Sequence, residues 1–209
     1  MPKSKHIVII MSILYLVGMA SAFTPLSPFV FTLSPLVILL TLIGFLIAIE
    51  ASIKCIQWIV IAGILGYTIE IIGVWTGIPF GNYSYGSGLS IKLFDVPVVL
   101  IANWALLTSI SLYATIKTPL LIQLSLPPVL ITLLDFLIEP VAIHYNWWSW
   151  EYQDVPLSNY LGWVVSAFFI NLLLVNTIKE NNLKKNTVGI SQFLLFVQFL
   201  FFGVLNISL

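Results

Sequence analysis

Three carboxyl side chains lie inside long apolar stretches of this sequence, and they are the residues best suited to chemistry. Glu70, Asp135 and Glu139 stand among aliphatic and aromatic neighbours, and the chain contains no Arg that could pair with them. A charged residue inside a membrane helix costs about 2.5–3.5 kcal/mol on insertion, so such residues usually serve a function. A carboxylic acid kept neutral in an apolar pocket can donate a proton to a weak base.

The spacing of these carboxyl groups places them at one depth. Asp135 and Glu139 are four residues apart and share one face of a helix. Glu70 lies seven residues before Gly77, which corresponds to about 10 Å along a helix. Other polar and aromatic residues lie near the same ends of neighbouring apolar stretches: Asn103, Trp104, Asn159 and Trp163. Four helices are therefore expected to bring these groups together in the outer third of a membrane.

The composition requires elements that cross a lipid bilayer. Of the 209 residues, 60% are hydrophobic and 8% are charged, whereas a soluble domain carries roughly 25% charged residues. Long unbroken apolar runs favour helices over the alternating strands of a membrane barrel. The predicted fold is an all-α, polytopic transmembrane helix bundle that forms a single domain over residues 1–209. We expect seven spans: Ile7–Phe23, Phe29–Ile49, Ile56–Trp75, Val96–Ile116, Leu120–Ile143, Tyr160–Ile178 and Val188–Ile207.

The distribution of lysines predicts that the N-terminus lies in the cytoplasm. In this orientation seven lysines are inside and Lys92 is outside, as the positive-inside rule requires. The inner lysines are Lys3, Lys5, Lys54, Lys117, Lys179, Lys184 and Lys185. The first apolar segment, followed by Ala20-Ser21-Ala22, also resembles a cleavable signal peptide. Because the rest of the chain is polytopic, we expect this segment to stay as a helix.

Two loops are expected to form structured caps on the outer side. Ile78–Asp95 and His144–Asn159 are rich in Gly, Pro, Trp, Tyr and Asn. Taken singly, the tryptophans of the second loop fit interfacial anchors. No basic stripe indicates a nucleic-acid partner. Cys55 is the only cysteine, and neither His6 nor His144 has metal-binding spacing, so no metal site is predicted.

Rare residues in a fixed order across four spans resemble one known family. They are Glu70 with Gly73–Tyr85, Lys92–Phe94 with Val96-Pro97, Asn103-Trp104, Leu134-Asp135 with Glu139–Ala142, Trp147-Trp148 with Trp150, and Val155–Tyr160 with Trp163. This pattern resembles the integral-membrane carotenoid 1,2-hydratases of the bisanhydrobacterioruberin hydratase type. It covers residues 63–163, and Asp95 stands where that family's pattern has a glycine. The first two spans and the last resemble the family only as generic apolar helices.

The resemblance implies a cofactor-independent hydro-lyase of carotenoid biosynthesis. Such an enzyme adds water to the terminal isopropylidene (1,2) double bond of an acyclic carotenoid end group and forms a tertiary alcohol. A fifty-carbon and a forty-carbon carotenoid stay open as substrates. The implied partners are a carotenoid within the bilayer, water and lipid, and other enzymes of carotenoid biosynthesis are candidates. The expected location is the cell membrane, which the chain crosses several times.

Hydration of this alkene needs an acid, a stabilised cation and a positioned water, and the sequence offers each. The predicted catalytic residues are Glu70, Asp135 and Glu139: Asp135 or Glu139 donates the proton, and Glu70 positions the water. Aromatic faces stabilise a cation by about 0.5–2 kcal/mol each, and Asn side chains hold a water without adding charge. The predicted substrate-binding residues are Tyr83, Tyr85, Asn103, Trp104, Trp147, Trp150, Asn159 and Trp163.

Three other functions remain alternatives. A small proton-coupled transporter also uses intramembrane acids, but the sequence shows no inverted repeat. The inner halves of the third and fifth spans carry no charge, and only Asn171 and Asn176 mark the inner part of the sixth. A structural subunit leaves three unpaired acids unexplained. A carotenoid cyclase is a further alternative, and an elongase would need paired Asp-rich motifs for magnesium, which are missing.

Overall fold

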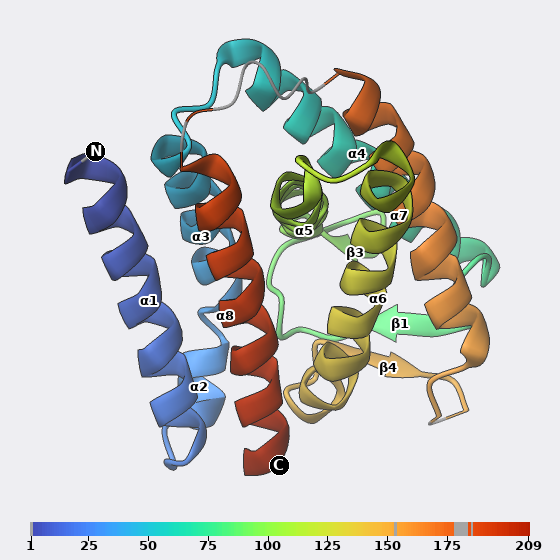
Figure 1. Cartoon of the computed structure of the whole chain (residues 1–209). Helices are drawn as coiled ribbons and strands as arrows, with labels where there is room; N and C mark the ends of the chain where they lie inside the picture. The colour runs from blue at the N-terminus through green and yellow to red at the C-terminus, as the bar shows by residue number, and fades with distance from the viewer. Residues whose placement is uncertain (1, 153, 178–183, 185) are drawn as a thin grey trace.

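The chain is an all-α polytopic helix bundle, seen here in a computed structural model that describes residues 2–152, 154–177, 184 and 186–209 (Figure 1). Five helices are long and apolar enough to cross a membrane: α1 (Pro2–Ala22), α4 (Ile53–Thr76), α6 (Leu120–His144), α7 (Leu157–Thr177) and α8 (Thr187–Ser208). Three shorter helices complete the described part of the bundle: α2 (Ser27–Phe31), α3 (Ser34–Ala48) and α5 (Leu100–Thr115).

The second expected span, Phe29–Ile49, is divided into two helices. α2 ends at Phe31 and α3 begins at Ser34. Each of these helices has a proline in its first turn, at Pro28 and Pro35. Proline suits the start of a helix, because its missing N–H would have no partner there in any case. The expected span is therefore not one continuous helix but is interrupted at residues 32–33.

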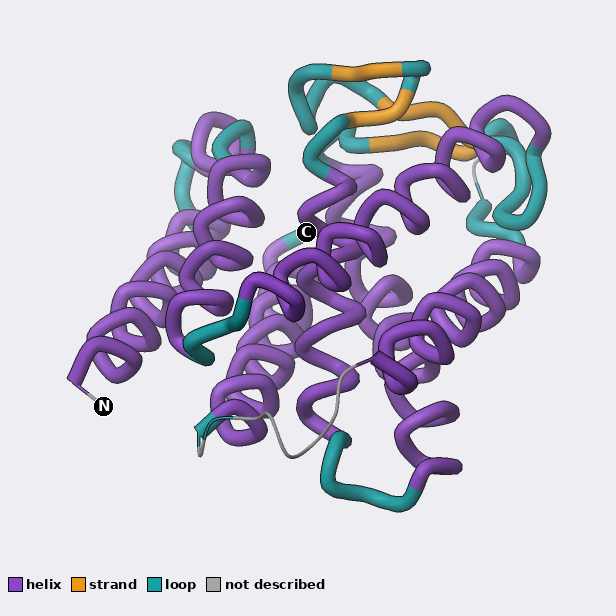
Figure 2. Tube along the Cα trace, turned by 90° about the horizontal axis from the view of Figure 1, so that it is seen from above, coloured by secondary structure: helices purple, strands orange, loops and turns teal. Residues whose placement is uncertain are grey.

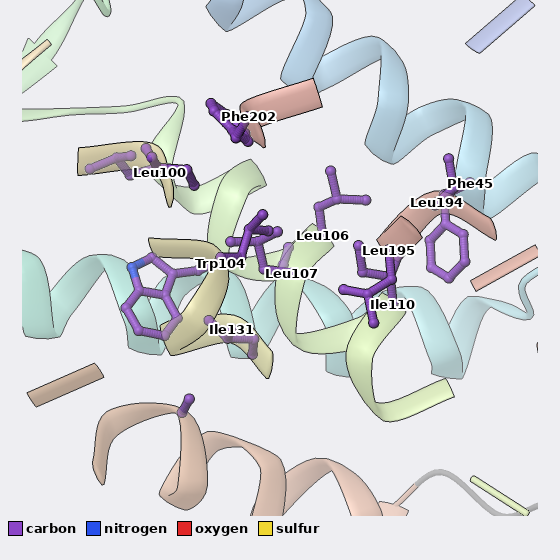
Figure 3. Close-up of a cluster of buried hydrophobic side chains, with 14 of the residues drawn as sticks. Phe45, Leu100, Trp104, Leu106, Leu107, Ile110, Ile131, Leu194, Leu195 and Phe202 are labelled. Carbon is purple, nitrogen blue, oxygen red and sulfur yellow. The ribbon is translucent and has the colours of Figure 1, made fainter. Parts of the chain in front are cut away.

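The fourth expected span, Val96–Ile116, is shorter than predicted and lies at the centre of the bundle. Its first residues form a strand, and α5 begins only at Leu100. Sixteen helical residues extend about 24 Å, less than the roughly 30 Å of a bilayer's hydrocarbon core. α5 is buried along most of its length and packs against α3, α4, α6 and α8. Figure 3 shows Leu106, Leu107 and Ile110 of α5 beside Phe45 of α3 and Leu194 and Leu195 of α8.

The two loops expected as structured caps pair with each other. Strand β1 (Tyr83–Tyr85) runs antiparallel to β4 (Trp148–Trp150), with Tyr83 opposite Trp150 and Tyr85 opposite Trp148. A second ribbon joins β2 (Lys92–Leu93) to β3 (Val96–Pro97). The strands gather at one side of the helices (Figure 2). We call residues 77–99 and 145–156 together the cap.

The turn between β2 and β3 contains Asp95, the position at which the resemblance predicts a glycine. Asp95 has φ 66° and the preceding Phe94 has φ 55°. Two-residue hairpin turns of this type need positive φ at both positions, which glycine adopts without strain. Asp tolerates this conformation better than most residues. The hairpin therefore forms although the glycine is missing.

One lysine predicted to face the cytoplasm forms an ion pair in the structure. Lys184, just before α8, lies 3.4 Å from Glu50 at the end of α3. Lys179 and Lys185, and Ile178 at the end of the sixth expected span, lie outside the described residues. The cytoplasmic N-terminus stays a prediction.

Candidate active site

Glu70 lies buried on α4 and accepts three hydrogen bonds. The hydroxyl groups of Tyr83 and Tyr85 donate to its Oε2 at 2.6 and 2.7 Å, and the Nε1 of Trp104 donates to its Oε1 at 3.1 Å. Two glycines on the same helix make room for these donors. A Cβ at Gly66 would lie 2.2 Å from the Trp104 ring, and one at Gly73 would lie 2.9 Å from the Tyr83 hydroxyl. The glycine spacing of α4 thus brings the donors within reach of Glu70.

Asp135 and Glu139 share one face of α6 and one amide group. The Nδ2 of Asn159, on α7, donates to Asp135 Oδ2 at 2.8 Å and to Glu139 Oε1 at 3.1 Å. Glu139 Oε2 also accepts from the indole nitrogens of Trp148 at 2.9 Å and Trp150 at 3.0 Å. Glu139 therefore accepts three hydrogen bonds, whereas Asn159 is the one side-chain partner of Asp135 among the described residues.

Aromatic rings connect the two carboxyl clusters. Trp104 stacks on Trp163 with ring centroids 4.3 Å apart and an angle of 10° between the planes. The ring centroids of Tyr83 and Trp150 are 5.2 Å apart. A tyrosine that donates to Glu70 therefore contacts a tryptophan that donates to Glu139. Phe80 lies against both Tyr83 and Trp163. The aromatic side chains come from α5, α7 and both halves of the cap.

The two cap tyrosines are held as neutral hydrogen-bond donors. Burial raises the pKa of Tyr83 and of Tyr85 well above the ordinary value for tyrosine, and the neighbouring Glu70 carboxyl raises both further. A phenol with a raised pKa keeps its proton at neutral pH. Both hydroxyl groups can therefore donate to Glu70 while their oxygen atoms still accept a hydrogen bond from a water.

A cavity of about 210 Å³ lies between these groups and continues toward α1, α2, α3 and α8. Of the eleven residues predicted for the site, ten line it: Glu70, Tyr83, Tyr85, Asn103, Asp135, Glu139, Trp147, Trp150, Asn159 and Trp163. The eleventh, Trp104, lies behind the lining, where it binds Glu70 and stacks on Trp163. The structure therefore brings the predicted side chains into one place, while their roles stay proposals.

The tryptophans of the second cap loop do not behave as simple interfacial anchors. Trp148 and Trp150 are two apart on a strand, so they point to the same side and both reach Glu139. Trp147 is buried and lines the cavity, and its Nε1 has no hydrogen-bond partner among the described residues. A buried N–H group without a partner is costly. Trp147 therefore brings an N–H group without a protein partner to the lining of the cavity.

Several lining residues were missed at the level of sequence. Trp148 and Phe80 belong to the quoted motifs but were not assigned to the site. Tyr15, Phe31 and Gln198 line the cavity from α1, α2 and α8, which were treated as generic apolar helices. The signal for Gln198 was present, because an amide inside an apolar span tends to form a hydrogen bond to another helix. Within the described residues, no three His, Cys, Asp or Glu side chains are placed to hold a metal ion.

Comparison with known proteins points to one family. The family model described as carotenoid biosynthesis protein matches residues 28–209. Among curated proteins, a similar sequence is the bisanhydrobacterioruberin hydratase of Haloarcula japonica, which is 30% identical over 129 residues. The match covers 51% of this chain and 40% of that relative, so the chain spans less than half the length of the curated protein it matches. No solved structure matches the chain.

Proposed function

The chain belongs to the family of carotenoid biosynthesis proteins, of the hydratase type, and on this premise we propose that it adds water to the terminal 1,2 double bond of an acyclic carotenoid. The product is a tertiary alcohol. The observation that carries this proposal is the set of three buried carboxyl groups around one cavity, with unequal hydrogen bonding. The whole chain acts as one domain in the cell membrane, which it crosses several times.

The hydrogen bonds favour Asp135 as the proton donor. N–H groups can only donate, so each one that reaches a carboxyl group stabilises its ionised form. Glu139 accepts three such bonds, from Trp148, Trp150 and Asn159, whereas Asp135 accepts one. Two acids that share one amide in an apolar site are suited to hold a single proton between them. That proton belongs on Asp135, beside the cavity.

The first chemical step moves this proton to the alkene. The O–H bond of Asp135 breaks, a C–H bond forms at the less substituted carbon, and a tertiary cation remains at the neighbouring carbon. The rings of Tyr83, Trp150 and Trp163 line the cavity, and aromatic faces attract a cation by about 0.5–2 kcal/mol each. The negative charges of Glu70 and Glu139 stabilise the same cation.

Water then captures the cation. The hydroxyl oxygens of Tyr83 and Tyr85, both hydrogen-bonded to Glu70, accept hydrogen bonds from the water and position it. The Nε1 of Trp147 and the amide of Asn103 are further polar groups for its oxygen. As the C–O bond forms, the water loses one proton to the Asp135–Glu139 pair. The pair returns to its starting state, so the net reaction is alkene plus water to alcohol.

The test is expression in bacterial cells that accumulate lycopene, with mass spectrometry of the extracted pigments. A hydratase adds the mass of one water for each end that reacts. Glu139→Gln serves as the active-site variant and Glu151→Gln, in the exposed part of the cap, as its control. If neither lycopene nor a fifty-carbon precursor changes in mass, hydration is wrong, and proton-coupled transport becomes the function to test.

A further inference from the structure

The cavity does not end at the carboxyl groups but continues between helices that the sequence pattern did not assign to the site. Its lining includes Tyr15 and Val17 on α1, Phe31 on α2, Val37 on α3, and Gln198 and Phe201 on α8. We call this part of the cavity the arm. Its residues lie outside 63–163, the region that carries the sequence resemblance, so the resemblance gives the arm no role.

The lining of the arm is suited to a hydrocarbon. None of the residues that α1, α2, α3 and α8 contribute to the cavity carries a charge. Phe31 stacks on Tyr145 of the cap with ring centroids 4.2 Å apart, and Phe201 meets Tyr15 edge-on at 5.2 Å. Flat rings and branched aliphatic side chains give close contact with an extended conjugated chain.

The arm reaches the outer surface of the bundle at the break between α2 and α3. Val17 and Leu33 both line the cavity, yet these residues are 56% and 43% exposed. Leu33 lies in the break itself, outside both helices. The backbone of the break stays hydrogen-bonded, because Leu33 N donates to Val30 O and Leu33 O accepts from Val37 N. Such a break can therefore lie beside a cavity within a membrane.

Hydrogen bonds fix the walls of the arm. Gln198 Nε2 donates to the hydroxyl of Tyr15 at 2.7 Å, and that hydroxyl lies 3.3 Å from Thr41 Oγ1. The three residues join α8, α1 and α3. A pocket whose walls are held together in this way exists before its ligand arrives.

We infer that the arm binds the polyene chain of the carotenoid, which enters and leaves through an opening between Val17 and Leu33. The inference rests on the proposed function for the place of the reacting end, beside Asp135. A carotenoid is an extended rod, so a molecule with one end at the carboxyl groups must continue out of the protein. The arm is the continuation of the same cavity, and its exposed lining faces the lipid in which the substrate is dissolved.

The test compares tryptophans placed at the opening with tryptophans beside it. Val17→Trp and Leu33→Trp fill the opening. Leu16→Trp and Leu36→Trp are the matched controls, because Leu16 on α1 and Leu36 in the first turn of α3 are 59% and 52% exposed but do not line the cavity. Each protein is purified from membranes of lycopene-accumulating cells. Two quantities are measured: polyene absorbance per protein, and the mass of the bound pigment.

We expect Val17→Trp and Leu33→Trp to retain less pigment than either control by about fivefold or more, since overpacking a filled site is costly. Equal retention in all four variants would overturn the arm as the binding site, and so would a wild-type protein that binds no polyene. The mass of the pigment answers a separate question. Pigment that is bound through the arm but unchanged in mass supports the inference and contradicts the proposed hydration.

Discussion

The two halves of the bundle that face the cavity differ in how they use polar groups. In the half formed by α4, α5, α6, α7 and the cap, three carboxyl groups accept hydrogen bonds from Tyr, Trp and Asn side chains drawn from four segments. In the half formed by α1, α2, α3 and α8, the polar lining contains no charge. A dense polar network orients reacting groups, whereas an apolar wall binds hydrocarbon without orienting it. We therefore assign the chemistry to the first half and chain binding to the second.

The largest expected effect is that of Asp135→Asn. Asn keeps the shape of the side chain and can still accept from Asn159, but it has no acidic proton. Hydration should fall about 10²–10⁴-fold, the usual contribution of general acid catalysis. Pigment mass spectrometry measures this, with Asp154→Asn, in the exposed cap, as the control. Near-normal hydration by Asp135→Asn would remove the assigned proton donor.

Glu70→Gln should have the next largest effect. Its amide nitrogen would face either Trp104 or the two tyrosines, all of which donate to Glu70. The loss of the charge and the disturbed water position should lower the hydration rate about 100-fold. Tyr83→Phe, which removes one donor and keeps the carboxyl group, should lower it less. If Tyr83→Phe had the larger effect, the hydroxyl group that contacts the water would matter more to the reaction than the charge of Glu70.

Trp147→Phe separates binding from stability. The Nε1 of Trp147 has no protein partner among the described residues, so its removal breaks no hydrogen bond within the fold. We expect a hydration rate about five- to tenfold lower, the effect of one hydrogen bond to an oxygen in the cavity. The melting temperature in detergent should fall only by the packing that is lost when a buried Trp becomes Phe. Trp148→Phe is the comparison, since it does break a bond, to Glu139. A lower melting temperature with full activity would mean that Trp147 only fills space.

Tyr15→Phe should have the smallest effect on the reaction. It removes the hydroxyl that joins α1 to α3 and α8, so the free energy of unfolding should fall by about 1–2 kcal/mol. The hydration rate with saturating substrate should stay within about twofold, because no reacting group is involved. Tyr152→Phe, at an exposed position, is the control for thermal unfolding. A large loss of rate would move chemistry into the half assigned to binding.

The candidate site was predictable where its residues are local or carry an unusual cost. Asp135 and Glu139 share a face because they are four apart on one helix, and Glu70 is conspicuous because a membrane rarely contains a charge. The break after Phe31 was also readable, since Pro35 lies inside the expected span Phe29–Ile49. It was missed because hydrophobicity alone defined that span.

Other contacts join segments too distant for any local pattern to connect. β1 pairs with β4 although Ser84 and the opposite Ser149 are 65 residues apart, and this pairing sets Tyr83 against Trp150. Tyr15 and Gln198 are 183 residues apart and meet only when α1 packs on α8.

The sequence by itself determined that this chain folds as apolar helices in lipid, and that three acids lie within them, since hydrophobicity and charge are properties of single residues. Only the tertiary structure decided which carboxyl group is left with one hydrogen bond. It also decided where the cavity continues and opens. The hydrogen bonds of each carboxyl group and the course of the cavity depend on which side chains from distant segments come into contact. Helix packing decides those contacts.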